Sequence, residues 1–184
     1  VLHVTEVKGS PLTRCDAKSL KAALLELGFV HVVWNWCIDA PGNHGSAIFS
    51  RIPIRKVTYG TGKDGTDTEG RTITTFFEDF ACVWTYTPCS SMDVSEPEPK
   101  RTKYAQALAE HVIKVQTQVG SGKVLVIGDM NVAPHGSDST IDQAIEKWFP
   151  SVKPYERAAY FDLLRKAQLV NVAETDGRKP EFTW

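Results

Sequence analysis

The sequence is short of the features that mark several classes of protein. Only four of its 184 residues are cysteines and none has Cys-x-x-Cys spacing, so neither a zinc site nor a dense disulfide framework is expected. The 21 basic and 22 acidic residues give a net charge of −1, which by itself predicts no polyanionic partner. The longest apolar stretch, residues 22–36, is interrupted by Glu26, His31 and Asn35 and predicts no membrane span. No signal-peptide pattern stands at the start, and with the scattered cysteines this favours an intracellular location.

The composition is that of a globular domain. Hydrophobic residues make up 42% of the chain and charged residues 23%, and the length predicts a single domain over residues 1–184. Strand-like segments stand at both ends, Val-Leu-His-Val at 1–4 and Glu-Phe-Thr-Trp at 181–184. Chain termini usually lie at the surface rather than inside buried elements. We therefore expect the domain to be incomplete at both ends.

The hydrophobic pattern alternates strands with helices. It predicts strands at residues 1–6, 29–36, 45–51, 71–77, 80–87, 123–128 and 169–172, and helices at residues 14–27, 101–118, 139–149 and 155–167. The run Lys-Val-Leu-Val-Ile-Gly at 123–128 is typical of a strand buried on both faces. The alternation predicts a layered α/β or α+β domain.

Polar residues follow this apolar run, in Gly-Asp-Met-Asn at 128–131. If the chain stays extended, Asp129 and Asn131 lie on one face at the carboxyl end of the strand. A carboxylate beside an amide can hold or deprotonate a water, or coordinate a hard cation such as Mg²⁺. The alternative is structural, with Asp129 capping a turn and Asn131 supplying a tight bend.

Two further strand ends carry candidate groups. Glu6 ends the first strand, and is a solvated charge, a partner of Lys8 or a metal ligand. Tyr86 ends the strand in Val-Trp-Thr-Tyr-Thr-Pro, and either donates a hydrogen bond to a phosphate oxygen or sits at the edge of the core. The cluster Lys100-Arg101-x-Lys103 either faces a phosphate backbone through Arg101 or is the solvated start of a helix. His44, on a glycine-flanked loop, reads as a solvated residue.

Taken in order, several segments resemble the exonuclease III family of apurinic/apyrimidinic endonucleases, within the endonuclease/exonuclease/phosphatase superfamily. They are Val-Thr-Glu-Val-Lys (4–8), Gly-Ser-Ala-Ile-Phe-Ser-Arg (45–51), Glu-Gly-Arg-Thr-Ile-Thr (69–74), Thr-Tyr-Thr-Pro (85–88), Val-Ile-Gly-Asp-Met-Asn-Val-Ala (126–133) and Phe-Thr-Trp (182–184). The resemblance implies a DNase I-like α/β fold, a four-layer sandwich of two packed mixed sheets flanked by helices.

The resemblance also implies a function. It is DNA repair by Mg²⁺- or Mn²⁺-dependent hydrolysis of the phosphodiester 5′ to an abasic site in double-stranded DNA, by a monomer without a membrane partner. The expected location is intracellular, and if the source is a eukaryote it is the nucleus or mitochondrion. Glu6 would bind the metal, Tyr86 would hydrogen-bond the scissile phosphate, and Asp129 with Asn131 would activate and place the attacking water. Trp184 matches an aromatic residue that lines the abasic-sugar pocket. Asn43 stands where a DNA-contacting tyrosine is common.

The departures from the family pattern keep other readings open. Cys89 replaces the asparagine that usually follows Tyr-x-Pro, and Asn171 replaces an aspartate after Leu-Val. None of the five histidines stands in place of the family's catalytic histidine, so we expect the 184 residues alone to be inactive. One alternative is another nuclease or phosphoesterase of the superfamily, of the RNA-processing, mobile-element or phosphatase type. The other is an inactive structural member of a larger assembly.

Overall fold

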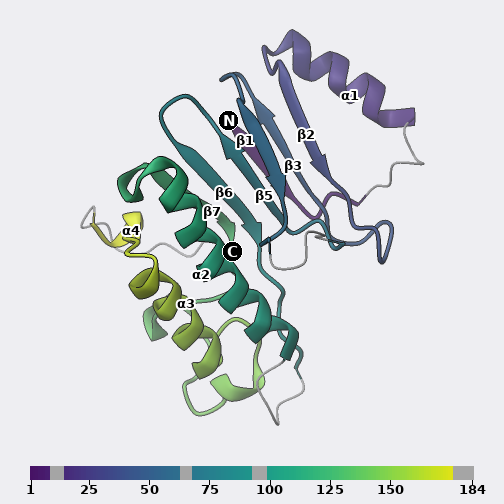
Figure 1. Ribbon diagram of the computed structural model, residues 1–184. Helices are drawn as coiled ribbons and strands as arrows, with labels where there is room; N and C mark the ends of the chain where they lie inside the picture. Colours follow the sequence, from purple (N-terminus) through teal and green to yellow (C-terminus); the bar gives the residue numbers. More distant parts are fainter. Residues whose placement is uncertain (9–14, 63–67, 93–98, 176–184) are drawn as a thin grey trace. The chain divides into compact units, whose positions relative to one another are not determined.

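A computed structural model describes residues 1–8, 15–62, 68–92 and 99–175. Its strands are β1 (Leu2–Thr5), β2 (His31–Asn35), β3 (Ser46–Ser50), β4 (Lys56–Tyr59), β5 (Thr72–Phe76), β6 (Ala81–Tyr86) and β7 (Val124–Asp129). Its helices are α1 (Cys15–Glu26), α2 (Pro99–Val119), α3 (Pro154–Lys166) and α4 (Val172–Thr175) (Figure 1). In the part of the chain that these ranges cover, no helix combines the length and hydropathy needed to cross a bilayer.

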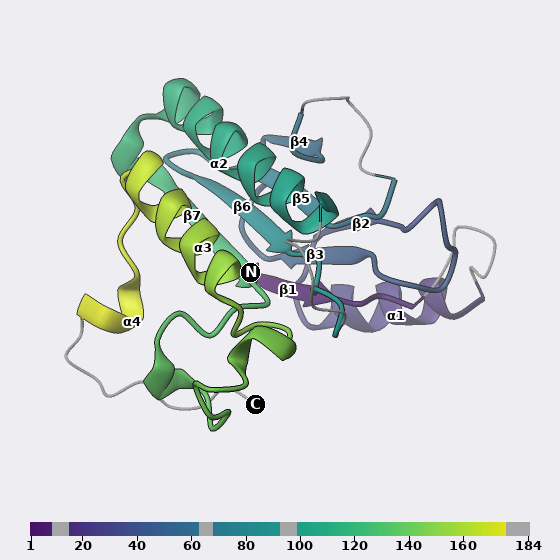
Figure 2. The ribbon, with the colours of Figure 1, turned by 90° about the horizontal axis from the view of Figure 1, so that it is seen from below.

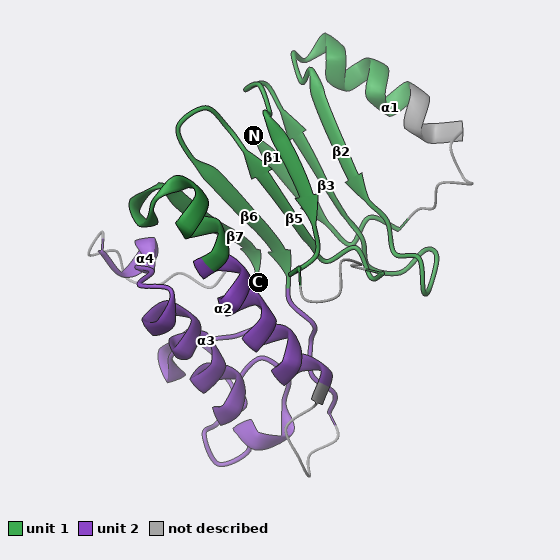
Figure 3. Cartoon of the chain, viewed as in Figure 1, with its two compact units in different colours: residues 1–86, 114–129 green, residues 87–113, 130–184 purple. Residues whose placement is uncertain are grey.

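The chain divides into two compact units (Figure 3). Unit 1 holds residues 1–86 and 114–129, and therefore all seven strands, α1 and the last turns of α2. Unit 2 holds residues 87–113 and 130–184, with the first part of α2, α3 and α4.

Two sheets make up unit 1. The first has strand order β1-β3-β2 and is antiparallel throughout. The second has order β4-β5-β6-β7, in which β6 and β7 run parallel and the other pairs are antiparallel. Parallel strands require a long crossover, and α2 supplies it between β6 and β7.

The core of unit 1 lies between the sheets. Ile48 of β3 packs with Ile73 of β5 and with Cys82 and Trp84 of β6, and all four are buried. On the opposite face of the first sheet, Leu24 of α1 packs against Ala47 and Phe49 of β3. Alternation along β3 thus sends Ile48 to one layer and its neighbours to the other, as period-2 side-chain geometry requires. Figure 2 shows α1 on the side of the first sheet that faces away from β5 and β6. The expected α/β fold with packed sheets flanked by helices is confirmed.

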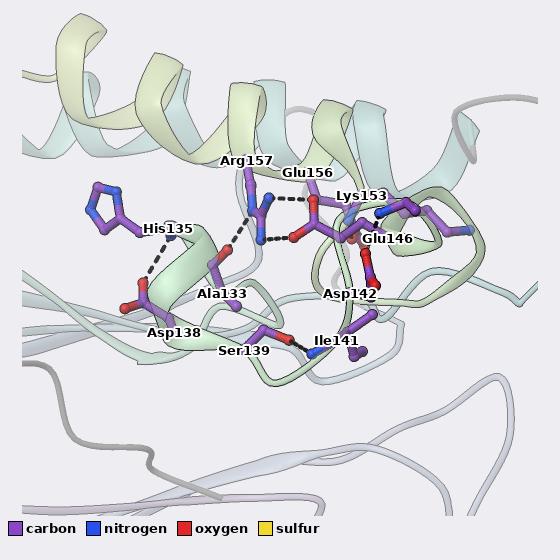
Figure 4. Close-up of polar contacts among 11 residues, drawn as sticks. Ala133, His135, Asp138, Ser139, Ile141, Asp142, Glu146, Lys153, Glu156 and Arg157 are labelled. Atoms are coloured by element: carbon purple, nitrogen blue, oxygen red, sulfur yellow. Dashed lines mark hydrogen bonds and ion pairs between the residues drawn. The ribbon is translucent and has the colours of Figure 1, made fainter.

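Several local expectations were wrong. The segment predicted as helix at 139–149 contains only the short 3₁₀ turn Glu146–Trp148, because side chains bind the backbone locally: Ser139 Oγ accepts from Ile141 N at 3.1 Å and Asp142 Oδ1 accepts from Ala144 N at 2.8 Å (Figure 4). The strand predicted at 169–172 is absent from the described structure, since Asn171 Oδ1 accepts from Ala173 N at 3.1 Å and starts α4. The short edge strand β4 was not predicted.

The expectation for β7 was also wrong, because this strand is not buried on both faces. Leu125 is 48% exposed and Ile127 is 40% exposed. Among the described strands β7 is an edge, and with β1 it lines an open groove of about 640 Å³. The groove runs up to Asp129 at the end of the strand.

Candidate active site

Three of the predicted site residues come together in unit 1. Tyr86 and Asp129 are the last residues of β6 and β7 and are register partners in the parallel pair. Glu6 follows β1 directly, and the Tyr86 hydroxyl donates a hydrogen bond to its Oε1 at 3.1 Å. The carboxyl ends of three strands from two sheets therefore bring Glu6, Tyr86 and Asp129 together, with the Tyr86 phenol bonded to Glu6 and Asp129 as its register partner.

The surroundings of Tyr86 shift the pKa of its phenol. Burial and the charge of Glu6, which also accepts its hydrogen bond, raise the pKa of the Tyr86 phenol, and Asp129 adds a smaller effect in the same direction. The Arg71 guanidinium opposes the rise. The phenol is consequently a hydrogen-bond donor at neutral pH, which is the state needed to bind a phosphate oxygen.

Arg71 contacts both the main chain and the ring of Tyr86. Its Nη1 donates to the Tyr86 carbonyl at 3.2 Å and its guanidinium carbon lies 4.9 Å from the centre of the Tyr86 ring. Its Nε donates to Glu69 Oε2 at 2.9 Å, and its Nη2 lies 3.2 Å from His44 Nδ1. The arginine is 4% exposed, so this network is held inside the unit.

Sequence reasoning gave Arg71 no role and read His44 as solvated. The His44 ring centre lies 6.1 Å from that of Tyr86, and the residue is half-buried rather than solvated. Arg71 belongs to the segment Glu-Gly-Arg-Thr-Ile-Thr that resembles the family, and this segment is the sequence feature that points to it. Asn43, one residue before His44, is exposed, and its main-chain N–H donates to the Ala40 carbonyl in a turn.

The predicted residues of unit 2 have different surroundings. Asn131 is 5% exposed with a φ of 47°, so the extended chain assumed for placing it on one face with Asp129 ends before it. Its Nδ2 donates to the Thr87 carbonyl at 2.7 Å. Arg101 is 3% exposed and donates to main-chain carbonyls, in contrast to the exposed, phosphate-facing position expected of it. Trp184 lies outside the described residues.

A divalent metal would find a suitable donor set in unit 1. Among the described residues no cluster of three or more His, Cys, Asp or Glu side chains is placed to hold a metal ion. However, Glu6 accepts a hydrogen bond from Tyr86, and Asp129 is the register partner of Tyr86, so the strand ends carry two carboxylates as hard oxygen donors. Mg²⁺ in nucleic-acid enzymes is bound by one or two carboxylates, with the substrate phosphate and waters completing its shell, and this donor set fits that pattern.

Comparison with known proteins gives related sequences over much of the chain. An exodeoxyribonuclease of Bacillus subtilis (strain 168) is 33% identical over 103 residues, which cover 56% of this chain and 39% of that protein. The DNA repair nuclease APEX1 of Danio rerio is 30% identical over 154 residues, which cover 83% of this chain and 48% of that protein. The chain thus spans half or less of the length of these curated relatives.

Solved structures share the fold. The 3′-5′ exonuclease NExo of Neisseria meningitidis superposes with a TM-score of 0.71 at 24% identity, over 90% of this chain and 60% of that one. An AP endonuclease of Archaeoglobus fulgidus superposes with a TM-score of 0.68 at 23% identity, over 89% and 59%. Residues 1–183 match the sequence family described as the Endonuclease/Exonuclease/phosphatase family. The chain therefore belongs to the endonuclease/exonuclease/phosphatase family, as the order of its strand-end motifs predicts.

Proposed function

We propose that this protein is a metal-dependent DNA-repair endonuclease that hydrolyses the phosphodiester 5′ to an abasic site. The observation that carries the proposal is the hydrogen bond from the Tyr86 phenol to Glu6, at a strand end whose register partner is Asp129. The similarity to a DNA repair nuclease and an exodeoxyribonuclease supports DNA as the substrate. A solved relative at 25% identity, described as a 3′ phosphatase bound to a product DNA hairpin, supports the same class of partner.

Each residue has a distinct task in this proposal. Tyr86 donates a hydrogen bond to a non-bridging oxygen of the scissile phosphate, and Arg71 fixes its ring and main chain. Asp129 orients the attacking water and accepts its proton, with Asn131 helping to place it. Glu6 holds the metal, which when bound neutralises charge that builds on the phosphate oxygens. Trp184 lines the pocket for the baseless sugar, and Asn43 contacts the duplex.

The test is incision of a duplex with a single stable abasic analogue, labelled on the 5′ end of the damaged strand. The full-length protein with Mg²⁺ should give one product that ends directly 5′ of the lesion, and a chelator should abolish it. Asp129→Asn should lower kcat by about 10²–10³-fold, the usual loss when one positioned group is removed. Asp162→Asn, an exposed carboxylate of α3, is the matched control and should leave kcat unchanged.

The same assay separates the alternatives. A preference for single-stranded RNA, for a 3′-phosphorylated end or for a phosphorylated inositol would assign the protein to another branch of the superfamily. No cleavage of any of these substrates would favour an inactive structural member. We further propose that the 184-residue chain alone does not incise, since no histidine matches the family's catalytic one. Incision by this chain would overturn that second proposal and leave the first intact.

A further inference from the structure

Arg101 is a buried charge whose hydrogen bonds go to the main chain of unit 2. Its side chain enters unit 2 from the first turns of α2 and is 3% exposed. The cavity beside it, lined also by Thr87, Met130 and Val132, has a volume of about 20 Å³. That is room for about one water molecule, and too little for a phosphate group. In this structure the partners of the guanidinium are therefore groups of the protein itself.

Its hydrogen bonds join two loops that are distant in sequence. Nη1 donates to the Pro88 carbonyl at 3.0 Å, and Nη2 donates to the Met130 carbonyl at 3.0 Å and the Asn131 carbonyl at 3.4 Å. Asn131 adds a second link between the same loops through Nδ2 and the Thr87 carbonyl, at 2.7 Å. Thr87 directly follows Tyr86, and Met130 directly follows Asp129.

Burying the guanidinium costs desolvation free energy, and its hydrogen bonds to the loop carbonyls offset that cost. Burial lowers the pKa of Arg101, and the negative charge of the fully buried Glu156 is the largest influence in the opposite direction. An apolar side chain would avoid the desolvation cost but would remove the hydrogen bonds that Arg101 donates to the loop carbonyls. Arginine presents its donors in a rigid planar fork that reaches two directions at once, whereas lysine presents a single point charge.

We propose that Arg101 is a positioning residue, whose guanidinium ties the loop after β6 to the loop after β7 and thereby fixes the strand ends that carry Tyr86 and Asp129. The inference rests on the proposed function in so far as those two residues act on the substrate. It requires no contact between Arg101 and DNA.

Hydrogen exchange tests the tie without reference to activity. Arg101→Met should accelerate exchange in peptides that cover residues 86–89 and 129–133 together, because loss of the fork frees both loops. Arg101→Lys should give an intermediate effect. Arg157→Met is the matched control, since Arg157 also donates to a main-chain carbonyl of unit 2, that of Ala133 at 2.8 Å, but does not reach residues 87–88. It should lower the thermal midpoint and leave exchange at 86–89 unchanged.

Kinetics test the positioning role. In the full-length enzyme Arg101→Met should lower kcat by about 10²-fold, as expected for a displacement near 1 Å of the reacting groups, with KM within about twofold of the wild type. Arg101→Lys should recover part of kcat, and Arg157→Met should retain kcat per folded molecule.

Three results would overturn the inference: unchanged exchange in both loops, a kcat that falls only with the folded fraction, or a rise in KM alone. If Arg101→Met does not fold, Arg101→Lys decides by the same criteria. If the wild type fails to incise but both loops loosen, the tie stands and the proposed function falls.

Discussion

Gly128 is the point in the candidate site where the backbone leaves least freedom. It is the register partner of Thr85 and the residue before Asp129, with a φ of +147°. A Cβ added here would overlap the Thr85 carbonyl oxygen and lie 2.9 Å from the Thr85 carbonyl carbon. These neighbours are backbone atoms of a buried strand, so no flexible side chain can yield. The Gly-Asp pair of the sequence motif is thus a requirement of close β6–β7 approach.

Gly128→Ala should therefore be strongly destabilising. A non-glycine residue in this backbone region costs about 1–3 kcal/mol. Forcing an extra carbon into a packed region costs about 1–3 kcal/mol more. The expected loss in the free energy of unfolding is about 2–6 kcal/mol, a large share of the about 5–15 kcal/mol of a typical domain.

Two other glycines separate backbone strain from atomic overlap. Gly42 has a φ of +92° with nothing within 4 Å of an added Cβ, so Gly42→Ala carries strain alone and should cost about 1–2 kcal/mol. Gly122 has open space around it and no positive φ, so Gly122→Ala should be neutral or stabilising by up to about 1 kcal/mol. Urea unfolding followed by circular dichroism gives the three values by linear extrapolation.

The ranking of the three variants by their loss in the free energy of unfolding tests the overlap argument. A loss for Gly128→Ala within about 1 kcal/mol of that for Gly42→Ala would refute the overlap argument, since both share only the strain. The overlap also predicts a functional result. Because Tyr86 and Asp129 are the next register pair, the folded fraction of Gly128→Ala should incise more slowly than wild type.

Further predictions concern the charges. Glu146→Gln should lower the free energy of unfolding by about 2–3 kcal/mol in urea titrations, because it weakens a bidentate pair with Arg157 at 2.8 and 2.9 Å whose side chains are mostly buried (Figure 4). Glu6→Gln should lower the pKa of Tyr86 in an ultraviolet difference titration against Tyr86→Phe, because the carboxylate opposes the phenolate. The raised pKa of Tyr86 means that the unfolded chain loses this proton first, so stability should fall as pH rises above 10, and less so in Tyr86→Phe.

The sequence predicts a helix and its buried face best where the apolar residues along that face are buried at helical spacing. Along α2, Leu108, Val112 and Val115 are all buried, as their spacing requires. The pattern in α1 was less reliable: Leu24 is buried, whereas Leu20 is 43% exposed and Leu27 is 61% exposed. Where burial is described along α1, Leu24 is the leucine that packs on the sheet, so the spacing of the other leucines does not indicate which face is buried.

The candidate site was predictable as a set of strand ends but not as a network. Strand alternation and the order of motifs indicate Glu6, Tyr86 and Asp129, because each stands where an apolar run stops. Arg71 is different, since its contacts with Tyr86 and His44 connect residues 15 and 27 positions away. Such contacts depend on sheet register, which no local pattern encodes. The surroundings expected for Arg101 were wrong for the same reason. A basic cluster at the start of a helix has the same sequence pattern whether Arg101 is exposed to solvent or buried.

Backbone conformation provides an independent marker of the site. Among the described residues, five non-glycine positions have positive φ: Glu6, His44, Asn131, Ser151 and Gln168. Gln168 stands just past the end of α3, where a left-handed residue commonly closes a helix. Glu6, His44 and Asn131 do not close a helix in this way; asparagine and histidine adopt positive φ more readily than most residues, and such conformations persist where surrounding contacts hold them. For Glu6 that contact is the Tyr86 hydroxyl, for His44 it is Arg71, and for Asn131 it is the Thr87 carbonyl together with Arg101. Within unit 1, the polar contacts that join Glu6 to Tyr86 and His44 to Arg71 therefore also hold two residues in an unfavourable backbone conformation.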